Sequence, residues 1–295
     1  MSASHNDIPF ICFGESFWSS RGMLAAGSPL KLACHLKRLG LQSFLVTRVG
    51  IDEEGKHLIS FAEANRVTTD LFQLDYELPT GTITAAGKFA PEKRADFHLQ
   101  AWDNIQWDPG FEKLPGARGF LVHGSLAARN EVSRRTFYRY LETGISRIFN
   151  LNLHASFYNR QVIEHCLRGT YLLKLTLEEL ELLTGWFGKV SGAADRMKLL
   201  QDRFSIPLIL VSTGQQGCML NVRGTMHEHP GFPPQNAGAA TAEDAFLAGA
   251  LLPLITGESP ANIMGYACAM QALAAAGKME FNYEPAMIHQ LHLKI

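Results

Sequence analysis

Short apolar runs alternate with amphipathic segments along the first two thirds of the chain. The runs are four to seven residues long, which favours strands buried in a parallel sheet. The predicted strands are Pro9–Phe13, Ser43–Val49, Gly119–Val122, Arg147–Leu151, Tyr171–Leu175 and Pro207–Ser212. Segments between them carry apolar residues three and four positions apart, as helices packed on a sheet do. The predicted helices are Pro29–Leu39, Glu53–Asn65, Glu131–Leu141, Leu177–Leu183 and Ala193–Phe204. This alternation predicts a doubly wound α/β domain.

The last third follows a different pattern. A hairpin is predicted from Cys218–Val222 and Thr225–His229 around Arg223-Gly224. Helices rich in small residues follow at Thr241–Ile255 and Pro260–Ala276. We therefore expect this part to be helix-rich.

One stretch, Leu78–Trp107, does not fit the α/β alternation. Its segments from Thr80 to Phe89 and from Asp96 to Gln100 alternate like an antiparallel pair, which predicts a flap outside the main sheet. Unpaired flap strands tend to be covered, so a homodimer through the flap is one expectation.

No repeat, low-complexity tract or flexible linker separates parts of the chain. We therefore expect one domain over residues 1–295, with flap, or lid, strands from about 14–26 and 78–107.

Composition narrows the possible functions. The 295 residues carry a net charge of -1 and are 46% hydrophobic, which suits a globular domain with a large core. Without a basic excess there is no footprint for DNA, RNA or an anionic membrane. The start lacks a signal peptide, and the apolar run Ala245–Ile255 is too short to span a bilayer, so we expect a soluble, cytoplasmic protein. Five scattered cysteines without a Cys-x-x-Cys pair indicate reduced core residues.

The stretch from Gly238 to Gly249 is the most informative for chemistry. It puts Asp244 at the entrance of a small-residue helix, where unpaired backbone N–H groups attract an anion such as a phosphate. Asp244 could then act as a base. Thr241 followed three residues later by an acid also fits a helix capping box, and local sequence leaves both interpretations open.

This stretch resembles the signature D-T-x-G-A-G-D-x-F of the PfkB (ribokinase-like) carbohydrate kinases. Asp244 and Phe246 match, whereas Thr241 and Glu243 replace two glycines and Gly238 replaces the leading acid. Further strings resemble that family in the expected order, most closely its fructokinase-like branch. They are Gly14-Glu15, Ala26–Ala33, Arg48–Gly55, Pro79–Gly81, Ala101–Ile105, His123–Arg129 and Lys174–Leu180. The resemblance implies a ribokinase-like α/β fold, a doubly wound, mainly parallel sheet with helices on both faces and a small β-flap.

The resemblance also implies ATP, Mg²⁺ and a sugar, with roles for individual positions. Asp244 would be the catalytic base. The anion hole would be Thr241, Ala242 and Glu243. Nucleotide would bind at Ser212, Thr213, Gly214 and Gly217, within a shifted form of the family's T-x-G-x-x-G. The substrate pocket would contain Ser19, Gly27, Lys31, Asn152 and His154. Glu179 would organise the metal indirectly, through water.

Departures from the family pattern cluster at the substrate positions. Ser19 replaces an Asp and Lys31 replaces an Asn, and an ammonium only donates hydrogen bonds where an amide also accepts them. Further along, Asn150 and His154 stand where the family's D-x-N-x-R has its acid and its arginine. These changes would alter the substrate or abolish its binding.

The departures at Thr241 and Glu243 concern catalysis. Side chains there change how closely backbone N–H groups can approach a phosphate. Glu243 also adds negative charge where phosphate charge would develop, and pointing into solvent would reduce the harm.

Structural alternatives stay open beside these roles. Glu179 is also explained as an exposed residue in the first turn of a helix, and Lys31 as a solvated lysine. Gly214 and Gly217 equally fit a strand-to-strand turn. For the whole chain two functions compete: an ATP-dependent sugar kinase of altered specificity, or a catalytically inactive homologue that serves as a ligand-binding or protein-interaction scaffold.

Overall fold

The computed structural model describes residues 8–19, 24–82, 99–108, 110, 119–154, 157–232, 242–276, 281 and 283–292. These residues form two compact units. The first, called the α7 unit, comprises Arg147–Asn152 and Glu164–Ile295; the second, called the flap unit, comprises Asn6–Ser146 and Leu153–Ile163. We describe each unit by itself, and the expected single domain over residues 1–295 stays a prediction.

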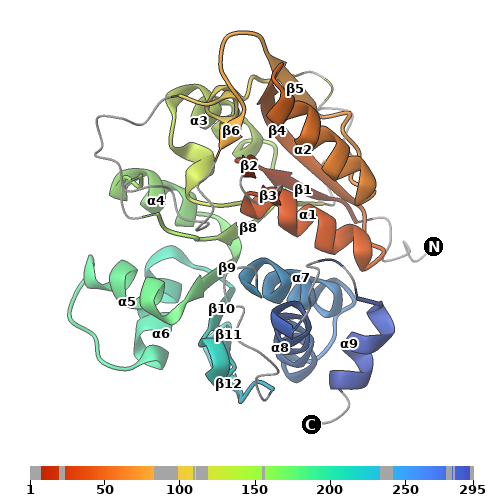
Figure 1. The fold of residues 1–295 in the computed structure, drawn as a ribbon. Coiled ribbons are helices and arrows are strands. Elements are labelled where there is room, and N and C mark those ends of the chain that lie inside the picture. Colours follow the sequence, from red (N-terminus) through yellow and green to blue (C-terminus); the bar gives the residue numbers. More distant parts are fainter. Residues whose placement is uncertain are drawn as a thin grey trace. The chain divides into compact units, whose positions relative to one another are not determined.

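The α7 unit is built on a five-stranded stretch of sheet in the order β12-β11-β10-β9-β8 (Figure 1). β8, β9 and β10 are parallel, and β11 and β12 add an antiparallel hairpin. The strands are β8 (Ser146–Asn150), β9 (Thr170–Thr176), β10 (Leu208–Ser212), β11 (Cys218–Val222) and β12 (Thr225–His229). The hairpin turns at Arg223 and Gly224, which both have positive φ.

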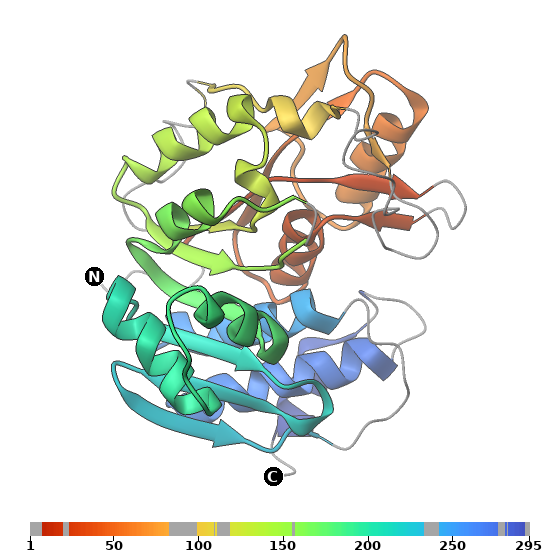
Figure 2. The same ribbon diagram turned by 90° about the vertical axis from the view of Figure 1, so that its left-hand side faces the viewer.

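Helices cover both faces of this sheet. In Figure 2, α5 and α6 lie on one face, while α7 and α8 lie side by side on the other. The helices are α5 (Leu177–Gly185), α6 (Ala193–Phe204), α7 (Ala242–Ile255), α8 (Pro260–Ala276) and α9 (Pro285–His292). α4 (Arg160–Leu167) contributes residues to both units.

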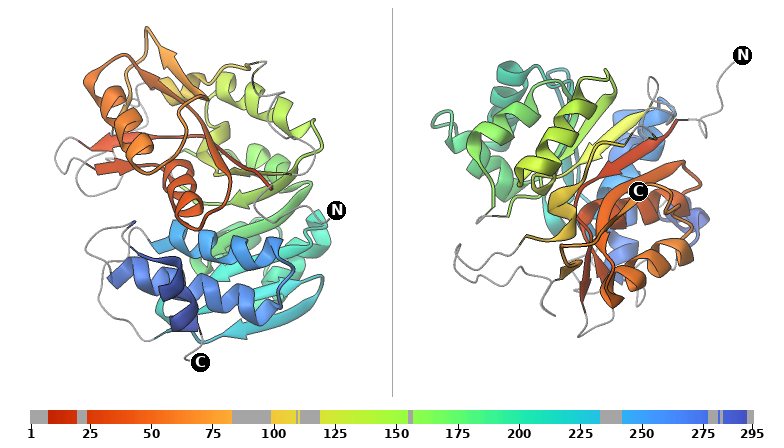
Figure 3. Two further views of the ribbon diagram at one scale, coloured as in Figure 1. Left: turned by 90° about the vertical axis from the view of Figure 1, so that its right-hand side faces the viewer. Right: turned by 90° about the horizontal axis from the view of Figure 1, so that it is seen from above.

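The flap unit contains four parallel strands in the order β7-β1-β4-β5. These strands are β1 (Phe10–Phe13), β4 (Ser43–Gly50), β5 (Phe72–Asp75) and β7 (Phe120–His123). In the right-hand view of Figure 3 they run between α1 and α2 on one side and α3 on the other. The three helices are α1 (Ser28–Arg38), α2 (Glu53–Ala64) and α3 (Glu131–Leu141).

A second, three-stranded sheet gives this unit its name. β2 (Phe17–Ser19) pairs antiparallel with β3 (Leu24–Ala26) and parallel with β6 (Gly81–Thr82). The Phe17 and Trp102 rings meet edge to face beneath it, at 5.5 Å between centroids. Trp102 belongs to the 3-10 helix η3 (Ala101–Asn104), so the end of the expected flap is helical.

The carboxylate of Asp52 joins two segments of the flap unit. Its Oδ1 caps α2 by accepting the N–H of Gly55 at 2.9 Å, and its Oδ2 accepts the N–H of Thr80 at 2.8 Å. The Thr80 hydroxyl donates to Asp52 Oδ1 and accepts the N–H of Gly50 at 2.8 Å. A Cβ added at Gly55 would lie 2.2 Å from the carbonyl oxygen of Gly50, so only glycine fits there.

The predicted strands and helices are confirmed to within two residues at most ends. Among the described α-helices and strands, β5, α4 and α9 were absent from the prediction. β5 is an edge strand with the sequence FQLD and a half-exposed face, so it lacks the apolar run that marks the central strands. The predicted antiparallel pair in the flap falls mostly on residues 83–98, outside the described part of the chain.

Two expectations from composition can be compared with the structure. All five cysteines are buried and none forms a disulfide, as predicted. Within the described ranges, no helix has the length and apolarity needed to cross a bilayer.

Candidate functional site

Three polar side chains stand in a row on one face of the sheet in the α7 unit. Asn150 on β8 pairs in register with Lys174 on β9, and Lys174 pairs with Leu210 on β10. Ser212, two residues after Leu210, faces the same side because side chains alternate along a strand. Asn150, Lys174 and Ser212 are each 2–3% exposed. The row lies at the carboxyl ends of the parallel strands, the edge where open α/β sheets bind ligands.

Glu243, in the first turn of α7, meets this row. Its Oε2 accepts hydrogen bonds from the Lys174 ammonium and, at 2.6 Å, from the Ser212 hydroxyl. Its Oε1 accepts from Nε2 of Gln271 on α8 at 3.1 Å. The Glu243 carboxylate is thus held by β9, β10 and α8 instead of pointing into solvent.

The electrostatics of Glu243 follow from these partners. Burial alone would raise the pKa of its carboxyl, but the charge of Lys174 and the three hydrogen bonds outweigh it and keep that pKa below its usual value. The Lys174 side chain is 3% exposed and the Glu243 side chain 35%. The negative charge expected to oppose a phosphate is therefore compensated by a buried cation.

Asp244 follows Glu243 on α7 and is half-buried. Nδ2 of Asn150 donates to its Oδ1 across 3.5 Å, a long hydrogen bond. α7 begins at Ala242, so Asp244 stands in its first turn, where backbone N–H groups lack partners within the helix. Thr241 and the side chain of Ala242 lie outside the described residues, and the capping-box interpretation stays untested with them.

The four predicted nucleotide residues lie at the last residue of β10 and in the connection from β10 to β11. The Ser212 hydroxyl is engaged with Glu243, so this side chain is directed into the protein. Thr213 donates its N–H to the carbonyl of Gly217 at 3.0 Å, which closes the turn around the 3-10 helix η7 (Gly214–Gln216).

The two glycines of this connection differ in what they require. Gly214 has φ +63 and open space around an added Cβ. At Gly217, with φ +93, an added Cβ would lie 1.9 Å from the carbonyl oxygen of His229. The turn interpretation therefore explains both glycines, and a role in nucleotide binding can coexist with it.

Glu179 closes a capping box at the start of α5. Its Oε2 accepts the N–H of Thr176 at 2.8 Å, and its own N–H donates to the Thr176 hydroxyl at 3.2 Å. The residue is half-buried and not fully exposed. In the described part of the chain no three His, Cys, Asp or Glu side chains gather as ligands for a metal ion. This does not conflict with Mg²⁺, which commonly binds through substrate phosphates, waters and one or two carboxylates.

The flap unit holds the predicted substrate residues Ser19, Gly27 and Lys31. Ser19 ends β2 and is 3% exposed. Gly27 precedes α1 with φ 110, and an added Cβ would lie 2.5 Å from the carbonyl oxygen of Glu15. Lys31 stands one turn into α1, with its N–H bonded to the Gly27 carbonyl at 3.0 Å. The close contact at Gly27 explains the glycine at the entrance of this helix.

Of the remaining substrate residues, Asn152 belongs to the α7 unit and has φ 42, a left-handed conformation that asparagine tolerates. His154 belongs to the flap unit. Burial, with the charge of Arg129, lowers the pKa of His154 to about 4. The imidazole is therefore neutral at pH 7 and can both donate and accept a hydrogen bond.

A buried ion pair that sequence reasoning missed lies in the flap unit. Nε of Arg129 donates to Oδ1 of Asp103 at 2.9 Å, and its NH2 group donates to Oδ2. The guanidinium also lies 4.1 Å from the centroid of Trp102. Burial raises the pKa of Asp103 despite the arginine, and burial lowers that of Arg129.

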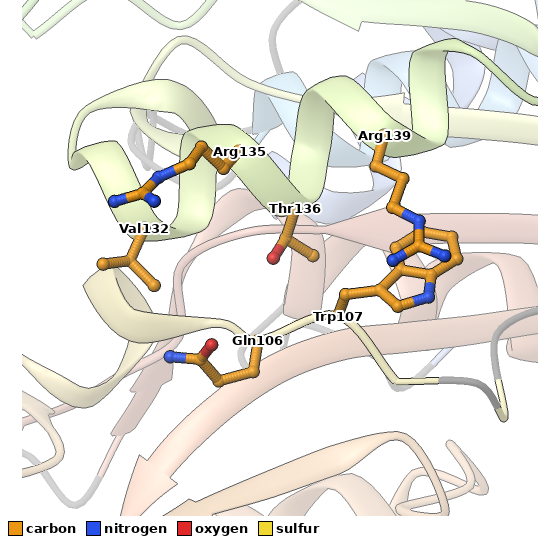
Figure 4. Close-up of a pocket in the computed structure, with 6 residues that line it drawn as sticks. All are labelled: Gln106, Trp107, Val132, Arg135, Thr136 and Arg139. Carbon is orange, nitrogen blue, oxygen red and sulfur yellow. The ribbon is translucent and has the colours of Figure 1, made fainter.

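A pocket of about 350 Å³ opens beside α3. Its lining residues are Gln106, Trp107, Val132, Arg135, Thr136 and Arg139 (Figure 4). The Arg139 guanidinium lies over the Trp107 ring, 4.0 Å from its centroid. None of the predicted site residues lines this pocket.

The fold is that of a ribokinase-like α/β protein. The structure of a fructokinase from Vibrio cholerae O395, in a form with fructose, ADP and calcium ion, matches with a TM-score of 0.82 at 19% identity, covering 97% of this chain and 99% of that one. A fructokinase from Xylella fastidiosa with bound ATP matches with a TM-score of 0.82 at 18% identity, covering 98% and 99%. The expected fold class is thereby confirmed.

Sequence comparison gives the family. Residues 19–282 match the family described as pfkB family carbohydrate kinase. A fructokinase from Klebsiella pneumoniae is 28% identical over 273 residues, which cover 88% of this chain and 87% of that protein. The chain therefore belongs to the pfkB family of carbohydrate kinases, and its class of enzyme is a sugar kinase, a phosphotransferase of fructokinase type.

Proposed function

We propose that this protein transfers the terminal phosphoryl group of ATP to a hydroxyl group of a sugar, with Asp244 as the base. The Asp244 carboxylate takes the proton of the hydroxyl while its oxygen forms a bond to the γ-phosphorus. The bond between that phosphorus and the bridging oxygen breaks, and ADP leaves with the electron pair.

The placement of Asp244 is the observation that carries this proposal. It stands in the first turn of α7, and Asn150 donates to its carboxylate from the end of β8. Backbone N–H groups at the start of a helix favour an anion, here the phosphoryl group in transfer. Because Lys174 compensates Glu243, the acidic residue beside Asp244 does not forbid that anion.

The nucleotide is proposed to lie beside Ser212–Gly217, with its phosphates toward the start of α7 and the anion hole at Thr241, Ala242 and Glu243. Mg²⁺ would be held through the phosphates and, by way of water, Glu179; when bound, it neutralises developing phosphate charge. The Vibrio cholerae and Xylella fastidiosa fructokinases, with ADP and calcium ion or with ATP, support the choice of ligands. A crystal soaked with nucleotide that shows phosphate elsewhere would contradict this placement.

The sugar is proposed to contact Ser19, Gly27, Lys31, Asn152 and His154. Fructose is the first candidate, since relatives are fructokinases. Lys31 donates only, so sugars that carry an acid group belong in the substrate panel beside hexoses and pentoses. A cytoplasmic location, the lack of nucleic-acid and membrane partners, and a homodimer through the flap remain proposals with this function.

The test is phosphate transfer from ATP–Mg²⁺ to that panel by the natural protein and by Asp244→Asn. The variant should keep its thermal melt and nucleotide affinity but lose roughly 10²–10⁴-fold in turnover, the scale for a positioned general base. Equal, sugar-dependent turnover in both folded proteins would eliminate Asp244 as the base.

A second candidate function is a catalytically inactive relative that binds a ligand or a protein. The substitutions at Ser19, Lys31 and Thr241 favour it, because each replaces a residue type that the family's chemistry uses. In that case the natural protein shows no turnover with any sugar, and Asp244→Asn changes stability by about 1 kcal/mol or less.

A further inference from the structure

The contacts of Glu243 reach three elements from the residue directly before Asp244. Lys174 contacts it from β9, Ser212 from β10 and Gln271 from α8. Both carboxylate oxygens are used, so the side chain fixes the first turn of α7 against the sheet and against α8. The family signature that this stretch resembles has glycine at the position of Glu243, and a glycine has no side chain to make these contacts.

We propose that Glu243 and Lys174 act as a positioning pair for Asp244: together they fix the first turn of α7, and Lys174 cancels the charge that Glu243 places beside Asp244. The proposal rests on the proposed function insofar as Asp244 is the base. It assigns the two side chains no contact with substrate, and the anion hole proposed above uses only the backbone N–H of Glu243.

The buried Lys174 ammonium needs the Glu243 carboxylate as its partner. Its side chain is 3% exposed, and it lies within a strand whose neighbours Leu173 and Leu175 are fully buried. An ammonium group left there without a partner is strongly unfavourable. Replacing Glu243 by the family's glycine therefore should not raise kinase activity, because it leaves the buried Lys174 ammonium without its carboxylate partner.

Two single substitutions leave opposite charges beside Asp244. Lys174→Met leaves the Glu243 carboxylate uncompensated, which disfavours ionised Asp244 and raises its pKa. Glu243→Gln leaves the Lys174 ammonium uncompensated, which favours ionised Asp244 and lowers its pKa. A role confined to stability would not produce shifts of opposite sign.

The first experiment is the pH dependence of kcat/KM for the natural protein, Lys174→Met, Glu243→Gln and the double variant. The acid limb should move to higher pH in Lys174→Met and to lower pH in Glu243→Gln, each by on the order of half a pH unit. The double variant should return near the natural limb and recover at least threefold in kcat over the worse single variant. Lys198→Met, which breaks an exposed ion pair with Asp202, is the control and should leave the limb in place.

A second experiment needs no turnover. In protein with ¹³C-labelled aspartate, titration of the Asp244 carboxyl should show the same two opposite shifts. This measurement decides the matter if no sugar in the panel is phosphorylated, which would count against the proposed function alone. If Asp244→Asn is fully active, the role of Asp244 as the base fails, and the titration still tests whether Glu243 and Lys174 set the charge beside Asp244.

Two results would overturn the positioning role. One is an unchanged Asp244 titration in both folded single variants. The other is a loss of kcat that simply follows the folded fraction, with no recovery in the double variant. If a single variant fails to fold, the double variant carries the comparison: it should fold, and Glu243→Gly with Lys174→Met should be more active than Glu243→Gly alone.

Discussion

Asn150 and Asp244, 94 positions apart in the sequence, are joined by a hydrogen bond of 3.5 Å from amide to carboxylate. Asn150 is the last residue of β8, and Asp244 lies in the first turn of α7. An amide in this position can orient the carboxylate without adding charge beside it.

Asn150→Leu should lower kcat by about twofold to fourfold, because a long hydrogen bond contributes near the low end of 0.5–1.5 kcal/mol. KM for ATP should change little, since Asn150 is buried and is not proposed to contact nucleotide. Steady-state kinetics with the best sugar, beside a thermal melt, checks this. An unaltered kcat would show that Asp244 does not depend on this amide.

The two glycines between β10 and β11 form a matched pair for a stability test. Gly217→Ala should lower the free energy of unfolding by roughly 3 kcal/mol or more, because the new Cβ collides with backbone and φ is positive. Gly214→Ala has the positive φ but open space, and should cost only about 1–2 kcal/mol. Urea unfolding measures both, and equal losses would refute the close approach at Gly217.

Two histidines, the buried His35 and the half-buried His154, should make stability depend on pH. The pKa is lowered to about 3 at His35 and to about 4 at His154, in both cases chiefly by burial. Below pH 6.5 these histidines bind protons in the unfolded chain but not in the folded protein. The free energy of unfolding therefore falls as the pH drops from 6.5 toward 4. Each histidine should contribute a slope of up to about 1.4 kcal/mol per pH unit.

The measurement is urea unfolding of the natural protein and of His154→Asn at pH 7, 6 and 5. The difference in stability between the two proteins should shrink, or change in favour of the variant, as the pH falls. A difference that is constant across this range would mean that His154 titrates normally in the folded state.

The substrate positions can be tested by reverting two of them. If the family's sugar pocket persists, Ser19→Asp with Lys31→Asn should strengthen binding of an ordinary hexose. Each recovered hydrogen bond should contribute roughly 0.5–1.5 kcal/mol, or up to about 3 with a charged partner. Calorimetric titration with fructose measures the gain, and a folded double variant without any gain would argue against this pocket.

The strands and helices could be predicted from the sequence because the residues that an element buries are apolar and recur with the period of that element. β10 is fully buried along its length, and its run of branched residues predicts it unambiguously. β5 was missed because an edge strand needs only one apolar face. α9 was missed because its eight residues have a single fully buried side chain, Ile288, and so no apolar stripe.

The candidate site was only partly predictable. Asp244 could be found because its helix entrance resembles a family signature. The partners of Glu243 could not, since Lys174, Ser212 and Gln271 come from three separate elements. One signal was present: a lysine flanked by two buried leucines in a strand needs an anionic partner, but nothing local to Lys174 says which one.

Asp52 has a consequence for how this protein can change over evolutionary time. One carboxylate caps α2 and fastens Thr80, and the glycines at 50 and 55 leave room for that arrangement. The strings Arg48–Gly55 and Pro79–Gly81, separate in the sequence, therefore form a single structural unit. A lineage that loses the aspartate gains nothing by keeping the threonine, so the two positions should covary among relatives.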